Sequence, residues 1–130
     1  MNAGNRTRTR GWLILLLFGA SIALAPLAAR AETQNVAVKD FLFEPTSLNI
    51  TQGDQVVWKN DGQRAHTVTF ADGLDSNPDC DNGGLLEDCL RPGETFDRTF
   101  TQTGEFKYRC KLHAHMTGAV VVAAAPTTTT

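Results

Sequence analysis

The sequence predicts one all-β domain, built as a sandwich or a barrel. Three observations lead to this fold class. The 130 residues suffice for one domain, no helix-period pattern of useful length follows the first 31 residues, and short alternating or β-branched runs recur between turn residues. These runs cover residues 35–39, 47–51, 55–60, 66–70, 95–101, 105–110 and 118–123. Turns that contain proline, glycine or asparagine separate them, so we expect each run to be a strand.

Residues 1–31 are predicted to form a secretory signal peptide. Three arginines precede an apolar stretch over residues 12–29, and small residues follow at the two positions that a signal peptidase reads. Cleavage leaves a domain over residues 32–125 and a disordered Thr-rich tail over residues 126–130. The alternative is an uncleaved membrane anchor, because an apolar stretch of 18 residues can just span a bilayer.

The predicted mature chain is acidic. The full chain has a formal net charge of −2, and removal of the leader leaves 8 basic against 14 acidic residues, a net charge of −6. Nucleic acid is excluded as a partner, because its phosphates require a basic surface. We expect a monomer, periplasmic or secreted, that contacts protein partners transiently and touches a membrane only if the leader is kept.

Within the domain, alternation separates a core face from a solvent face. In the run over residues 55–60, Val56 and Trp58 share one face, and Lys59 lies on the other. Four more apolar residues follow two-residue spacing and are expected in the core without a chemical role, namely Phe41, Phe43, Leu48 and Ile50.

Residues 71–93 are predicted to form a long acidic loop with one helical turn around residues 85–88. Its carboxylates do not match the spacing of an EF-hand calcium loop, so we interpret it as solvated. The loop carries Cys80 and Cys89, and export favours a disulfide between them that stabilises the fold by roughly 2–3 kcal/mol. Two free thiols, or pairing with another chain, are the alternatives.

The third cysteine belongs to a pattern of metal-binding residues. At the end of a predicted strand the chain reads Cys110-x2-His113-x2-Met116, and His66 begins another predicted strand. Two imidazoles, one thiolate and a weak axial thioether are the ligands that select copper for electron transfer. A chance conjunction or a different metal is the alternative.

Three longer motifs extend over nearly the whole domain: Phe41-x-Phe43-x-Pro45-x2-Leu48-x-Ile50-x2-Gly53-Asp54-x-Val56-x-Trp58-x-Asn60, His66-Thr67-Val68-Thr69-Phe70, and Gly104-x-Phe106-x-Tyr108-x-Cys110-x2-His113-x2-Met116-x-Gly118-x-Val120. With these motifs the sequence resembles the cupredoxins, or type 1 (blue) copper proteins, and within them the plastocyanin and amicyanin branch. The resemblance implies a Greek-key β-sandwich of about eight strands that holds one copper ion near one end. It assigns His66, Cys110, His113 and Met116 as ligands. The implied function is one-electron transfer, with copper cycling between Cu(I) and Cu(II) and the edge of His113 as the exit to a partner.

Several features depart from that family pattern. Thr67 stands where asparagine is common, and its hydroxyl is expected to bond across to the Cys110 loop. Leu112 stands where these proteins carry proline, so its backbone N–H is expected to donate to the Cys110 sulfur, and Leu112→Pro is predicted to lower the reduction potential. His115 lies between two predicted ligands and is expected to point to solvent. The acidic loop is expected to cover one face of the sandwich or to bind a partner.

A type 1 copper protein that carries single electrons is therefore the first functional hypothesis. The alternative is a copper storage or delivery protein without an electron-transfer role. A thiol hydrolase with Cys110 as nucleophile ranks third, because the sequence shows no oxyanion-hole signature and leaves the methionine unexplained. A multicopper oxidase is excluded, because the sequence has three histidines. We predict that the protein is not an enzyme.

Overall fold

The computed structural model describes residues 1, 30–80 and 85–127 of the chain. The apolar stretch of the predicted leader and the last three threonines lie outside the described residues. Among the residues that the structure describes, no helix has both the length and the apolar character to cross a membrane.

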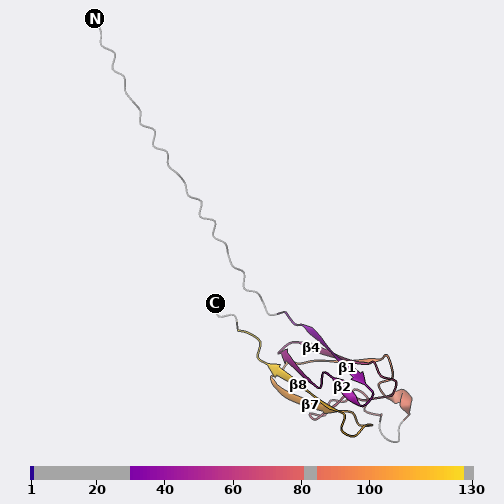
Figure 1. The fold of residues 1–130 in the computed structure, drawn as a ribbon. Helices are drawn as coiled ribbons and strands as arrows, with labels where there is room; N and C mark the ends of the chain where they lie inside the picture. Colours follow the sequence, from indigo (N-terminus) through magenta and orange to yellow (C-terminus); the bar gives the residue numbers. More distant parts are fainter. Residues whose placement is uncertain (2–29, 81–84, 128–130) are drawn as a thin grey trace.

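Eight strands form two sheets of four, packed face to face (Figure 1). The strands are β1 (Thr33–Lys39), β2 (Leu42–Glu44), β3 (Ser47–Thr51), β4 (Gln55–Asn60), β5 (Thr69–Phe70), β6 (Thr95–Thr99), β7 (Gly104–Arg109) and β8 (Thr117–Ala123), with a 3₁₀ turn η1 (Leu86–Asp88) between β5 and β6. The first sheet has the order β2-β1-β4-β6 and the second β3-β8-β7-β5. The predicted all-β sandwich of about eight strands is confirmed.

The strand order mixes parallel and antiparallel pairs. β1 runs parallel to β4, with Val36 opposite Trp58, and β3 runs parallel to β8, with Leu48 opposite Val120. The pairs β4–β6, β7–β8 and β5–β7 are antiparallel. Because the parallel partners are joined by long connections, the chain repeatedly crosses between the two sheets and closes one shared core.

Trp58, fully buried, stands at the centre of that core. Its ring lies 5.3 Å from that of Tyr108, 5.5 Å from that of Phe70 and 5.7 Å from that of Phe96, measured between centroids. These contacts join the two sheets, since Trp58 belongs to β4 and Tyr108 to β7. Gly118 faces Tyr108, and a Cβ at that position would overlap the phenol ring, so the close packing requires glycine there.

Two expectations from the sequence differ from the structure. Phe41, expected in the core, is 56% exposed, whereas Phe43 is 1% exposed. The backbone of Phe41 has a φ of 73°, so the chain turns there and the alternation begins only with β2, a strand that the patterns did not predict. The run expected over residues 66–70 is a strand only at Thr69–Phe70, because His66 and Val68 hydrogen bond to the 71–93 loop instead of the sheet.

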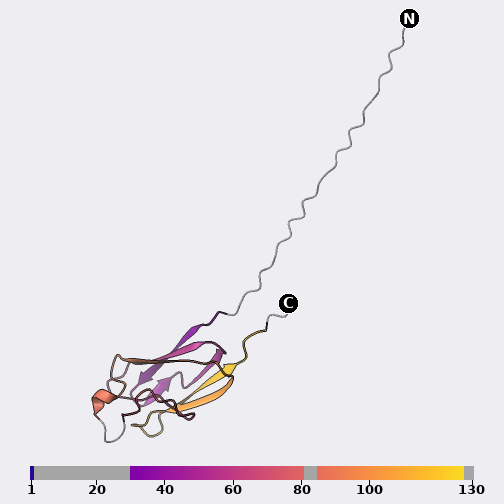
Figure 2. The ribbon, with the colours of Figure 1, turned by 180° about the vertical axis from the view of Figure 1, so that it is seen from behind.

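The two ends of the sandwich differ in character. Both ends of the described domain leave the sandwich at the same end, whereas η1 and the β7–β8 connection lie at the opposite end (Figure 2). That connection, residues 110–116, carries three of the four predicted copper ligands. The predicted site therefore lies at the end of the fold remote from the termini.

Candidate metal centre

Three predicted ligands from two distant parts of the chain meet at the remote end of the sandwich. Cys110 follows β7 directly, and its sulfur lies 3.8 Å from Nδ1 of His66 and 3.5 Å from Nδ1 of His113. One ligand atom from each of the three residues lies within 4.8 Å of the other two. His66 and Cys110 are buried, and His113 is half-buried. This spacing leaves room for one small ion between the three donor atoms.

The short turn between β7 and β8 is closed by its own backbone. Cys110 N–H donates to the carbonyl of Met116 at 3.0 Å, and Met116 N–H donates to the carbonyl of His113 at 3.3 Å. Met116 is buried, with 1% of its surface exposed. The backbone of the turn therefore keeps Cys110, His113 and Met116 within one compact unit at the end of the core.

His66 is held by the far end of the 71–93 loop. Its backbone exchanges two hydrogen bonds of 3.0 Å with Leu90. Asn60, buried at the end of β4, donates from Nδ2 to the carbonyls of Leu90 and Arg64, each at 2.8 Å. This network satisfies the polar groups of a buried turn and fixes where the His66 ring enters the site.

The His66 imidazole is set up to act as a neutral ligand. Burial, and then the charge of His113, lower its pKa below the usual value for histidine, which favours the uncharged ring. Its Nε2 has no hydrogen-bond partner among the described residues, and the nearest oxygen of the Asp40 carboxylate, 3.7 Å away, is too far for a hydrogen bond. Backbone N–H groups of Gln63 and Arg64 bond to the same carboxylate oxygen and lower the pKa of Asp40.

Thr67 links the two halves of the site. Its backbone N–H donates to the Cys110 sulfur at 3.4 Å, and its hydroxyl accepts a 2.9 Å hydrogen bond from Lys111 N–H. The expected bond from the Thr67 hydroxyl to the Cys110 loop is therefore present. The expected bond from Leu112 N–H to the sulfur is not found among the described residues, so no such bond supports a lower reduction potential for Leu112→Pro. Leu112 instead packs, partly buried, against the core.

Of two residues beside the site, His115 lies where the sequence predicts it and Phe41 does not. His115 is exposed and lies outside the ligand cluster, as expected, with a φ of 69°. Phe41, expected in the core, lies edge-on to His113 with ring centroids 5.1 Å apart. The guanidinium of Arg64 stands 5.1 Å from the Phe41 ring centroid. No periodic pattern could have placed Phe41 here, because the positive φ that turns it outward has no sequence signature in a phenylalanine.

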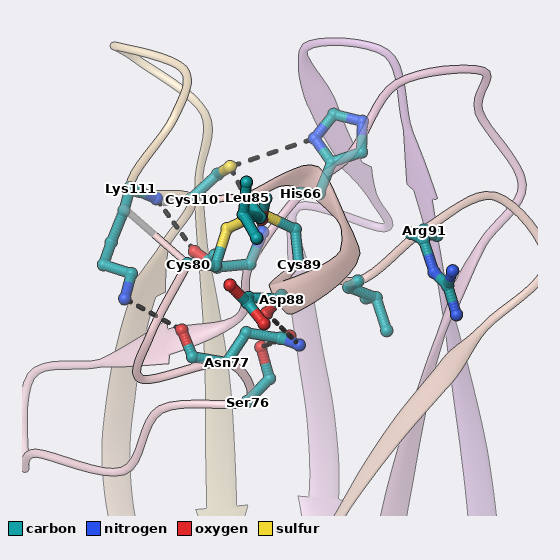
Figure 3. The surroundings of a disulfide bond; sticks show 12 residues. His66, Ser76, Asn77, Cys80, Leu85, Asp88, Cys89, Arg91, Cys110 and Lys111 are labelled. Atoms are coloured by element: carbon teal, nitrogen blue, oxygen red, sulfur yellow. Dashed lines mark hydrogen bonds between the residues drawn. A yellow bond between two sulfur atoms is a disulfide. The ribbon is translucent and has the colours of Figure 1, made fainter. Parts of the chain in front are cut away.

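The predicted disulfide is present between Cys80 and Cys89, and both residues are buried (Figure 3). The 71–93 loop that carries it is exposed to solvent at most of its described positions, as expected, although two of its carboxylates form ion pairs with the rest of the domain. Asp72 forms an ion pair with Arg98 at 2.5 Å, and Asp75 forms one with Lys111 at 2.8 Å. The helical turn predicted around residues 85–88 is present as the 3₁₀ turn η1. Two described residues of the loop, Ser76 and Leu90, hydrogen bond to the segment that carries His66.

Comparison with known proteins places these residues in a known context. The profile of the family described as copper binding proteins, plastocyanin/azurin family, matches residues 31–123. A chloroplastic plastocyanin of Tetradesmus obliquus is 34% identical over 113 residues, which cover 80% of this chain and 77% of the relative. Amicyanin of Paracoccus denitrificans is 30% identical over 121 residues, which cover 84% and 88%.

Solved structures agree with the sequence matches. A reduced amicyanin mutant superposes with a TM-score of 0.57 at 26% identity, over 70% of this chain and 82% of that one. A purple cupredoxin of Nitrosopumilus maritimus superposes with a TM-score of 0.54 over 69% of this chain and 99% of that one, and at 23% identity it shows the shared fold alone.

Proposed function

This chain belongs to the plastocyanin/azurin family of copper-binding proteins, and from that premise we propose that it carries single electrons between partner proteins with one type 1 copper ion. The proposed ligands are His66, Cys110, His113 and Met116. One observation carries the proposal: the Cys110 sulfur lies within 3.8 Å of Nδ1 of both histidines, although Cys110 and His66 are 44 positions apart in the chain.

The residues present fit a copper ion of this type. Of the three cysteines in the chain, Cys110 is the free one, and it is buried beside two imidazoles rather than exposed to oxidants. The lowered pKa of His66 favours the neutral ring that a metal requires. Soft sulfur ligands favour Cu(I), and imidazole also suits Cu(II), so this donor set accommodates both oxidation states. When bound, copper supplies the reversible exchange of one electron.

The surrounding residues keep the ligands in one arrangement. The Thr67 N–H group bonds to the Cys110 sulfur, the backbone of Leu90 holds His66, and the turn from Cys110 to Met116 is closed by its own hydrogen bonds. A fixed donor set favours electron transfer, because little rearrangement then accompanies a change in oxidation state.

His113 is the proposed point of electron exit. It is half-buried, whereas His66, Cys110 and Met116 are buried, so its ring is the part of the ligand set nearest to solvent. The exposed ring of Phe41 lies against it. A partner that docks over this end brings its own redox centre closest to the ligand set through His113.

Copper storage or delivery is the second candidate, and the family match does not favour it. We propose that the protein has no enzymatic activity, a proposal supported by its relatives named plastocyanin and amicyanin. We also propose a monomer that is periplasmic or secreted, with transient redox partners. The disulfide supports this location, because such bonds persist in oxidising compartments.

Addition of Cu(II) to the purified protein tests the function. We expect an intense thiolate-to-copper band in the visible spectrum and a narrow copper hyperfine splitting in the EPR spectrum. Reversible reduction with rapid self-exchange supports electron transfer, whereas loss of copper to a competing chelator on reduction supports delivery. Cys110→Ser is expected to abolish the band. A band that persists in Cys110→Ser, or a colourless wild-type protein, would refute the proposed site.

A further inference from the structure

Lys111 follows the proposed ligand Cys110, and its side chain is turned away from solvent. Only 18% of that side chain is exposed, and its ammonium group reaches the 71–93 loop (Figure 3). Nζ lies 2.8 Å from Oδ2 of Asp75, 2.9 Å from the carbonyl of Asn77 and 3.1 Å from the carbonyl of Pro78. All three donors of the ammonium group therefore have an acceptor in one short segment.

A closed circuit of hydrogen bonds returns from that segment to Lys111. Lys111 N–H donates to the hydroxyl of Thr67, which lies 3.0 Å from the hydroxyl of Thr69. Thr69 donates to Oδ1 of Asp75 at 3.0 Å, so the Thr67 hydroxyl is left to donate to Thr69. Lys111 only donates, Asp75 only accepts, and each threonine hydroxyl between them accepts once and donates once, an arrangement in which neighbouring hydrogen bonds polarise and strengthen one another.

This ion pair differs from the others on the protein surface. The Lys107–Glu105 pair is 3.6 Å long, with 70% and 52% of its side chains exposed, and pairs of that kind contribute little. The Asp75 side chain is only 16% exposed. Burial raises the pKa of Asp75, but hydrogen bonds from Lys111, Asn77 N–H and Thr69 outweigh it and leave that pKa below its usual value.

The segment that receives Lys111 is itself held by the disulfide. Cys80 N–H donates to the carbonyl of Asn77 at 3.1 Å, and the Asn77 side chain donates to the carbonyl of Asp88 at 3.0 Å, next to Cys89. The carbonyl that accepts from Lys111 therefore lies on backbone that the Cys80–Cys89 bridge restrains.

We propose that Lys111 is a positioning residue that ties the Cys110 turn to residues 75–78, the segment next to the Cys80–Cys89 disulfide. Through its backbone and its ammonium group it holds the Cys110 sulfur in place between Thr67 and the two histidines. The part of this inference that concerns copper rests on the proposed function. The part that concerns the placement of the thiol does not, and it can be tested without copper.

The copper-free test measures how fast Cys110 reacts with a small aromatic disulfide reagent. Removal of one charged hydrogen-bond partner by Lys111→Met or Asp75→Asn is expected to raise that rate about fivefold or more. Lys107→Met is the matched control, because it removes an exposed lysine of the adjacent strand. Val56→Ala destabilises the core without touching the circuit, and it shows how far a general loss of stability raises the rate.

Equal rates in wild type, Lys111→Met and Asp75→Asn would overturn the proposal. The same holds if Val56→Ala, at a matched loss of stability, raises the rate as much as Lys111→Met does. The double variant Asp75→Asn/Lys111→Met is expected to react no faster than the faster single variant, because both changes break the same circuit.

With copper bound, the reduction potentials of the variants distinguish a positioning role of Lys111 and Asp75 from an effect of their charges alone. If Lys111 and Asp75 act only as charges, their replacement shifts the reduction potential in opposite directions, down for Lys111→Met and up for Asp75→Asn, and the double variant returns to the wild-type value. If Lys111 and Asp75 instead position the thiol, the reduction potential is expected to shift in the same direction in both single variants, and the visible and EPR spectra are expected to change. Opposite shifts with unchanged spectra would overturn the proposal. A wild-type protein that forms no blue site would refute the proposed function, while the thiol rates would still decide the role of Lys111.

Discussion

Loss of the Cys80–Cys89 disulfide should lower the free energy of unfolding by an amount that follows from its place in the chain. The bridge joins two cysteines nine positions apart. Restraint of a loop of that size in the unfolded chain corresponds to about 2.6 kcal/mol at 25 °C. The free energy of unfolding of a small domain falls linearly with urea concentration, and with the slope expected for such a domain the urea midpoint of unfolding should fall by roughly 1–2.5 M.

The assay compares oxidised and reduced protein in the copper-free Cys110→Ser background, where no third thiol can exchange with the bridge. Cys80 and Cys89 are buried, so the reduced form is prepared by unfolding and refolding in reductant. The variant Cys80→Ala/Cys89→Ala is the control, because its stability should not respond to reductant. The reasoning would be refuted if reduction lowered the free energy of unfolding by less than about 0.5 kcal/mol in the protein that keeps Cys80 and Cys89. An equal loss on addition of reductant to the control variant would refute it as well.

A functional consequence follows from the position of Leu90, next to Cys89. The backbone of Leu90 exchanges two hydrogen bonds with His66, so the bridge restrains the backbone that holds a proposed ligand. Removal of the bridge by Cys80→Ala/Cys89→Ala, with Cys110 intact, should therefore weaken copper binding, measured by competition with a chelator. Unchanged copper affinity in this variant would show that Leu90 holds His66 without help from the disulfide.

Three further predictions concern single residues. Thr67→Val should lower the free energy of unfolding by about 1–3 kcal/mol, because Lys111 N–H then loses its acceptor in a partly buried site, and urea titration of the copper-free protein would measure the loss. The hydrogen bond from Arg98 lowers the pKa of Asp72 in the folded protein, so Asp72 should make the wild type more stable than Asp72→Asn. This difference in stability should be full above about pH 4 and should disappear as the pH falls through the lowered pKa of folded Asp72. Thermal melting of both proteins over this pH range measures the difference, and a difference that does not change with pH would contradict the prediction. His115→Ala should keep the blue absorption, since His115 is exposed and outside the cluster, and a colourless variant would contradict that placement.

Local patterns were sufficient where one strand face is core and the other solvent. The bounds of β3 and β4 agree with the runs predicted over residues 47–51 and 55–60, and Trp58 is buried as expected. The disulfide pairing followed from the count and location of the cysteines, because two lie in one loop and the third lies beside histidines. In each case, neighbours in the chain carry the information.

Other features depend on contacts between distant segments. The pattern placed Phe41 in the core, and the structure places it on the surface against His113, because a backbone turn at Phe41 breaks the two-residue alternation. The sequence also predicted a hydrogen bond from Leu112 N–H to the Cys110 sulfur, whereas the donor in the structure is Thr67 N–H. A hydrogen bond to a given atom depends on local angles and distances that residue types do not specify.

The sequence by itself determined the fold class, the copper chemistry and the four proposed ligands, because strand alternation and ligand spacing are encoded in short stretches of chain. Only the tertiary structure decided that Leu90 holds His66 and that Lys111 reaches Asp75 across the loop. A lysine after a cysteine has the pattern of an ordinary surface residue, and its burial arises from a loop more than 30 positions away that packs over it.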